Sequence, residues 1–125
     1  SRFEMTMLYR TQVTHIGEYA ADALDDNMMI LFNDNAPADV ADYCFIHPAA
    51  DLTGEIKAGG QFVLGASRYP ITAVGDVVNQ NLAELGHITI RFDGGAEAEY
   101  PGTVHVAGKC PEALVLGTEL IFQTE

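Results

Sequence analysis

Short apolar runs separated by turn-forming residues recur along the whole chain, and this pattern most narrowly limits its fold. MMILF at 28–32 and QFVL at 61–64 are compact apolar runs, while ITIRF at 88–92 alternates cleanly. Turn signals stand between such runs, as in AGG at 58–60, DGG at 93–95 and PG at 101–102. Runs of this length and composition are typical of β-strands. The pattern predicts an all-β fold, a small barrel-like domain or sandwich.

Eight strands and one or two short helices are expected. The first helix would be capped by Asn35, carry Pro37 in its first turn and end near Tyr43. Asp76 would cap the second, which would end at Gly86 with an apolar stripe of Val77, Val78, Leu82 and Leu85. The expected strands are Leu8–Ile16, Met28–Phe32, Cys44–His47, Gln61–Leu64, Tyr69–Val74, Ile88–Phe92, Thr103–Val106 and Glu119–Phe122.

Length and charge narrow the classes of function. A chain of 125 residues predicts a single domain over residues 5–125, with Ser1 to Glu4 read as an extension or expression remnant. No signal peptide or membrane-spanning run is read in it. The formal charge of −12 disfavours nucleic acid and anionic membranes, but it suits a protein partner with a basic face. Cys44 and Cys110 lack metal-site spacing, so reduced thiols are expected.

Several motifs recur at an offset of 58 residues. VTHIG at 13–17 resembles ITAVG at 71–75, and Gly59 and Gly117 begin similar runs. DYCFIH at 42–47 resembles EYPGTVH at 99–105 with one extra residue, and His47 and His105 are also 58 apart. We interpret this as a duplication with halves of about 8–70 and 71–125, whose sheets would pack about a pseudo-twofold axis. His47 and His105 would then occupy equivalent places.

His47 is the first candidate for chemistry. It ends an apolar run, and Pro48 favours an extended backbone there and ends the strand. A side chain at a strand end can reach a cleft, where an imidazole can act as a nucleophile or move a proton. A structural histidine bonded to a neighbouring carbonyl is the simpler alternative. On pattern alone this alternative is favoured.

The other histidines are weaker candidates. His105 lies between two valines, so it faces away from the core if they are buried. His87 follows a helix end and suits a turn or cap, and His15 suits a solvent-facing position. Basic residues that converge on a histidine would bind an anion, and an acidic residue could orient an imidazole through its second nitrogen. The basic candidates are Lys57, Arg68, Arg91 and Lys109, and the acidic ones are Asp51, Glu55 and Asp93.

Common nucleotide-binding and hydrolase motifs are missing from the sequence. It has no Walker loop, dinucleotide fingerprint, nucleophile elbow or HExxH. If the protein handles phosphate, the phosphate should arrive already attached to another protein.

Three stretches resemble the glucitol/sorbitol-specific enzyme IIA component of the bacterial phosphotransferase system. They are APADVADYCFIH, QFVLG followed by RYPITAVG, and LGHITIRFDG followed by AEYPGTVHVAG, and the resemblance runs from about Met5 to Phe122. It implies an all-β barrel-like phosphocarrier of the cytoplasm without cofactor or metal. HPr would phosphorylate it on the histidine of YCFIH, here His47, and it would pass the phosphoryl group to the IIB domain of a sorbitol permease.

The resemblance also assigns supporting roles. His105 would donate to the phosphoryl oxygens if it lies near His47, and His87 is a weaker candidate for this. An open, shallow site with an apolar rim of Tyr43, Phe45 and Ile46 would suit transient partners. Family members often carry Cys and His directly after the motif, where this chain has Pro48 and Ala49, so any helper role there is absent.

Two other classes of function remain open on the sequence. The chain could be a non-catalytic binding or regulatory module, in which His47 would be buried and fully bonded. It could also bind a metal if His47, His87 and His105 converge.

Overall fold

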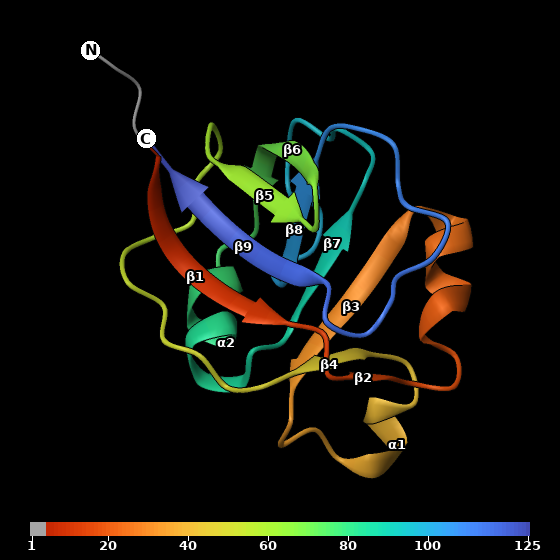
Figure 1. Cartoon of the computed structure of the whole chain (residues 1–125). Coiled ribbons are helices and arrows are strands. Elements are labelled where there is room, and N and C mark those ends of the chain that lie inside the picture. Colours follow the sequence, from red (N-terminus) through yellow and green to blue (C-terminus); the bar gives the residue numbers. More distant parts are fainter. Residues whose placement is uncertain (1–4) are drawn as a thin grey trace.

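The computed structural model describes residues 5–125, and its fold is mostly β, as predicted. Ser1 to Glu4, read above as an extension, lie outside the described residues. Nine strands form one curled sheet in the order β1-β9-β5-β6-β8-β7-β3-β4-β2 (Figure 1). The strands are β1 (Thr6–Gln12), β2 (His15–Ile16), β3 (Met28–Asn33), β4 (Phe45–His47), β5 (Gln61–Leu64), β6 (Ser67–Val74), β7 (Ile88–Arg91), β8 (Thr103–Val106) and β9 (Glu119–Thr124).

The strand positions match the expected runs closely, with one correction. The expected strand over Leu8–Ile16 is two strands, because β1 pairs with β9 whereas β2 pairs with β4. Val13 lies at this change of partner and bonds to Thr118 through both its N–H and its carbonyl-side contact with Gly117. The chain thus passes from one side of the sheet to the other between β1 and β2.

The helices are short. They are α1 (Ala38–Ala41), α2 (Val78–Leu85) and a 3₁₀ helix, η1 (Ala20–Asp26), which the sequence analysis missed. The second helix ends at Gly86 as expected, in a left-handed conformation with φ of 59°. Its stripe is narrower than expected, because Val78 and Leu82 are buried but Leu85 is 43% exposed. No helix within residues 5–125 is long and apolar enough to cross a membrane.

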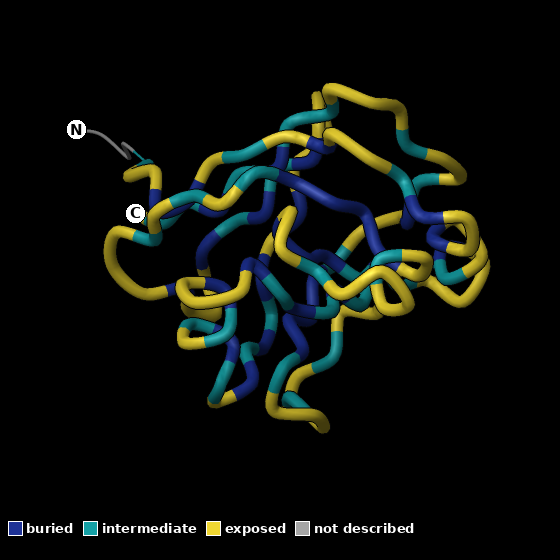
Figure 2. The backbone as a smooth tube through the Cα atoms, turned by 90° about the horizontal axis from the view of Figure 1, so that it is seen from below, coloured by how far each residue is buried: buried dark blue, intermediate teal, exposed yellow. Residues whose placement is uncertain are grey.

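The main core lies on the concave side of the sheet. Phe62, Phe122, Ile88, Ile90 and Val104 are almost completely buried there. Figure 2 shows buried backbone gathered in the interior, with exposed residues mainly along the loops. We call this side the inner face, and the opposite side of the sheet the outer face. Phe32, Cys44 and Ile46 form a second, small apolar cluster that is separate from the main core.

The two halves of the chain repeat the same strand pairings. Strands β3 and β4 are parallel and pair Phe32 with Ile46, while β7 and β8 are parallel and pair Arg91 with His105. Both members shift by the same amount, since 91 − 32 = 59 and 105 − 46 = 59. The loops agree, because Gly17 N–H donates to the Cys44 carbonyl and Gly75 N–H donates to that of Thr103. A duplication behind this repeat stays a prediction.

This register shows that His47 and His105 are not equivalent, contrary to the expectation above. The extra residue makes the offset 59 between β3–β4 and β7–β8, so His105 matches Ile46. A one-residue difference in register puts two side chains on opposite faces of a sheet. His47 therefore faces inward, and His105 faces outward.

Candidate functional site

His47 lies at the end of β4 and is completely buried. Its Nδ1 is 2.9 Å from the Pro48 carbonyl oxygen, and its Nε2 is 2.9 Å from that of Gly86. The Tyr9 ring lies edge-on to the imidazole at 6.1 Å between centroids. The expected open, shallow site is therefore not what surrounds His47, which is enclosed by backbone on both sides of its ring.

Gly86 shapes this enclosure. A Cβ atom there would lie 2.6 Å from Cε1 of His47 and 2.9 Å from Cβ of Asn33. Only a glycine allows the end of α2 to come this close while holding a φ of 59°. The carbonyl of Gly86 belongs to the C-terminal end of the helix, where carbonyl groups carry partial negative charge. It is thus a good acceptor for an imidazole N–H.

A pocket of about 380 Å³ lies beside the segment that covers His47. Arg10, Thr11 and Gln12 of β1 line one side, with Pro48, Ala49 and Ala50 on the other. The Thr11 hydroxyl donates to the Pro48 carbonyl at 3.2 Å, and Arg10 Nε pairs with Glu119 at 3.0 Å. Residues 48–50 have no regular secondary structure. A single layer of irregular backbone therefore separates this pocket from Nδ1 of His47.

Tyr9 adds a buried hydroxyl to the same neighbourhood. Its Oη has no hydrogen-bond partner of good geometry among residues 5–125. Burial raises the pKa of Tyr9 to about 12, so the phenol stays protonated at neutral pH. It can therefore serve as a hydrogen-bond donor. The sequence analysis missed Tyr9 because nothing local distinguishes it from a core tyrosine.

His105 forms a separate pair with Asp93 on the outer face. Its Nδ1 donates to Asp93 Oδ1 at 2.7 Å, and its buried Nε2 has no partner among the described residues. Burial alone would raise the pKa of Asp93, but hydrogen bonds from His105 and the Gly95 N–H, and the His105 and Arg91 charges, lower it overall. Of the three acidic residues expected to orient an imidazole, Asp93 does so.

His105 does not support His47. Strands β8 and β4 are separated by β7 and β3. Three inter-strand spacings of about 4.8 Å place them about 14 Å apart. Because the two side chains also face opposite sides of the sheet, His105 cannot donate to a phosphoryl group on His47.

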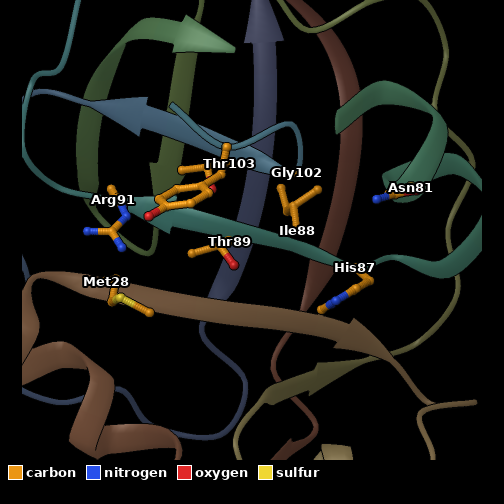
Figure 3. A pocket seen from close by; sticks show the side chains of 9 residues that line it. Met28, Asn81, His87, Ile88, Thr89, Arg91, Gly102 and Thr103 are labelled. Carbon is orange, nitrogen blue, oxygen red and sulfur yellow. The ribbon is translucent and has the colours of Figure 1, made fainter. Parts of the chain in front are cut away.

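His87 lies next to Gly86 but points into a different pocket, on the outer face (Figure 3). Its Nδ1 donates to the Leu31 carbonyl at 2.9 Å, and its ring stacks on Phe32 at 4.4 Å. This fixes the proton on Nδ1 and leaves Nε2 as an accessible lone pair. His15 is exposed, as expected.

Two other expectations fail. Phe45 and Ile46 are buried and cannot form a docking rim, although Tyr43 is 55% exposed and stacks on Tyr19. No three His, Cys, Asp or Glu side chains within residues 5–125 gather as a metal site would require, so the three histidines do not converge. The two cysteines are free and buried.

Comparison with known proteins adds the family. Residues 8–121 match the family model for the PTS system glucitol/sorbitol-specific IIA component. The chain belongs to this family. Relatives from Shigella flexneri and Escherichia coli K12, each named PTS system glucitol/sorbitol-specific EIIA component, are 54% identical over 120 residues, covering 96% of this chain and 98% of theirs.

A solved structure supports the fold. The crystal structure of a PTS system IIA component from Enterococcus faecalis V583 matches with a TM-score of 0.78. The match covers 89% of this chain and 96% of the other at 24% identity. The curled β architecture thus recurs in this IIA component.

Proposed function

We propose that this chain is a cytoplasmic phosphocarrier that accepts a phosphoryl group from HPr on His47. It then passes the group to the IIB domain of a glucitol/sorbitol permease. Membership of the IIA family supports a role in the phosphotransferase system. The observation that carries the choice of His47 is the pair of backbone carbonyls that hold its two ring nitrogens.

A neutral imidazole carries one N–H and can donate to only one of these carbonyls. The Gly86 carbonyl is the better acceptor, since it ends α2 and carries part of the helix dipole. With the proton on Nε2, the Nδ1 lone pair faces the Pro48 oxygen, and two lone pairs repel. The contact on the Nδ1 side is therefore the one that gives way at low cost.

Displacing the Pro48 carbonyl would open Nδ1 to the pocket beside β1. Residues 48–50 are irregular and partly exposed, so they can move without breaking a strand pairing. The pocket would then present Arg10 and Thr11 to the phosphoryl oxygens, with the Tyr9 hydroxyl as a further donor. Arg10 would have to leave its exposed pair with Glu119, which costs little.

The transfer itself balances without an added proton. The Nδ1 lone pair of His47 forms the new N–P bond as the N–P bond of the donor phosphohistidine breaks, and the donor imidazole leaves with that electron pair. The Nε2–H bond to Gly86 holds the tautomer throughout. Transfer onward to the IIB domain reverses these roles.

The burial of His47 favours one rival function. A histidine with no exposed surface and both nitrogens against carbonyls also fits a non-catalytic binding or regulatory module. The two functions differ in whether residues 48–50 open when a phosphorylated partner docks.

Reconstitution separates them. The full chain is incubated with phosphoenolpyruvate, enzyme I and HPr, alongside the His47→Gln, His87→Gln and His105→Gln variants, with exposed His15→Gln as the matched control. We expect acid-labile phosphate on every protein except His47→Gln, whose fold is checked by its NMR spectrum. Two-bond ¹H–¹⁵N correlations of the phosphorylated imidazole should place the phosphate on Nδ1.

The outcomes are distinct. Labelling of a folded His47→Gln variant would move the site to another histidine. A wild-type protein that never labels would favour the non-catalytic module. Phosphate on Nε2 would keep His47 as the acceptor but reverse the assignment of the tautomer.

A further inference from the structure

The outer face differs in kind between the two halves of the chain. At four places on this face, the first half carries apolar side chains and the second half carries polar ones. Residues 59 positions apart are equivalent in this region, as the paired strands establish. The equivalent pairs are Ile30 and Thr89, Phe32 and Arg91, Cys44 and Thr103, and Ile46 and His105.

The apolar set shows what the fold needs at these places. Phe32, Cys44 and Ile46 pack together as a small cluster, with Ile30 against it. A β-sheet face is stable with this filling, so polar residues in the second half are not required for folding. Four polar replacements at equivalent positions therefore point to a ligand rather than to packing.

A glycine opens the second half where a tyrosine fills the first. Gly102 is equivalent to Tyr43, since 102 − 43 = 59, and the Tyr43 side chain stacks on Tyr19. Around Gly102 lies a cavity of about 270 Å³. Figure 3 shows Arg91, Thr89 and His87 placed in turn along this cavity. We call it the outer-face pocket; its lining is Met28, Asn81, His87, Ile88, Thr89, Arg91, Tyr100, Gly102 and Thr103.

The polar tips in this pocket lack protein partners. Arg91 Nε is buried without a hydrogen bond to any described residue, and its Cζ lies 5.9 Å from the centre of the Tyr100 ring. The hydroxyls of Thr89 and Thr103 likewise bond to no other group within residues 5–125. Buried donors without partners are rare in folded proteins. A ligand that accepts several hydrogen bonds would satisfy them.

The charge of the pocket selects an anion. Arg91 is permanently protonated, and its planar fork suits the oxygens of a phosphoryl group. Asp93 lies close enough to Arg91 for the two charges to interact, but its carboxylate already accepts bonds from His105 and the Gly95 N–H. Asp93 is not part of the pocket lining. Hydroxyls and an imidazole complete a donor set typical of oxyanion sites.

We propose that the outer-face pocket binds a phosphoryl oxyanion, either as inorganic phosphate or as the phosphate end of a small phosphomonoester. Its volume, roughly that of nine water molecules in the liquid, suits a phosphate with at most a short carbon chain. Arg91 contacts the anion, with Thr89, Thr103 and His87 around it. This site lies on the outer face and does not depend on phosphotransfer at His47, which faces inward.

Titration of the isotope-labelled full chain tests the site. Backbone amide NMR spectra are followed while inorganic phosphate, glycerol 3-phosphate or sulfate is added. Arg91→Gln removes the charge, and Gly102→Tyr fills the pocket as Tyr43 does in the first half; a Cβ at Gly102 lies 3.8 Å from Asn81 Nδ2, an ordinary contact. Arg68→Gln is the matched control, since Arg68 is an exposed arginine outside the pocket.

We expect phosphate to shift the amides of β7 and of residues 100–103. Arg91→Gln should weaken binding at least about tenfold, as loss of a charge-assisted hydrogen bond implies, while Arg68→Gln should not. Tighter binding of glycerol 3-phosphate would identify an esterified ligand, and equal binding would identify inorganic phosphate.

Three results would overturn the proposal. They are no shifts at millimolar phosphate, equal affinity in a folded Arg91→Gln variant, and sulfate binding as tightly as phosphate. The His47→Gln variant should bind phosphate like the wild type. Failure of the phosphorylation assay and failure of this titration are therefore independent.

Discussion

Gly86→Ala tests whether the end of α2 encloses His47 as the structure describes. An alanine Cβ would meet Cε1 of His47 at 2.6 Å and Nε2 at 3.0 Å, so the imidazole must move. Movement breaks the 2.9 Å hydrogen bond to the Gly86 carbonyl, which costs about 1–3 kcal/mol in a buried site. The left-handed backbone adds roughly 1–2 kcal/mol for a residue with a Cβ. The free energy of unfolding should fall by about 2–5 kcal/mol.

Gly65→Ala is the matched control for backbone strain. Gly65 has a φ of 60°, close to the 59° of Gly86, but its nearest contact would be Thr118 Cγ2 at an ordinary 3.6 Å. Only the backbone cost of roughly 1–2 kcal/mol should appear there. The difference between the two variants, measured by urea denaturation, isolates the contact with His47.

A double-mutant cycle completes the test. In a His47→Ala background the clash is absent, so Gly86→Ala should cost no more than Gly65→Ala does. If Gly86→Ala and Gly65→Ala lose the same stability in the wild-type background, the described packing of His47 against the helix end is incorrect.

Three further predictions address the core, the acidic pair and the thiols. Leu82→Ala should lower the free energy of unfolding by about 2–5 kcal/mol, whereas Leu85→Ala should change it by less than about 0.5 kcal/mol; urea denaturation measures both. The lowered pKa of Asp93 means that its contribution is present above the ordinary range near 4 and is lost as pH falls through the folded value, so the stability gap between wild type and Asp93→Asn should close in acid. Burial raises the pKa of Cys44 to about 11, so a thiol reagent should label it only at the rate of unfolding; fast labelling of native protein would contradict this.

The sequence alone determined where strands and turns lie. The runs at 61–64 and 103–106 coincide with β5 and β8, and the helix end at Gly86 was located correctly. These features are local, because side-chain periodicity and the φ tolerance of glycine act within a few residues. The exposed Leu85 shows the limit of such reasoning, since the neighbours that bury one side of a helix come from elsewhere in the chain.

The tertiary structure decided which face each histidine occupies. His47 and His105 looked equivalent because both lie 58 residues apart in similar motifs, yet the paired strands are offset by 59. One extra residue in the loop before β8 turns a whole strand over, because side chains alternate between faces with a period of two. Sequence similarity locates a motif, but only long-range strand pairing fixes its register, and register separates the enclosed His47 from the outer-face pocket.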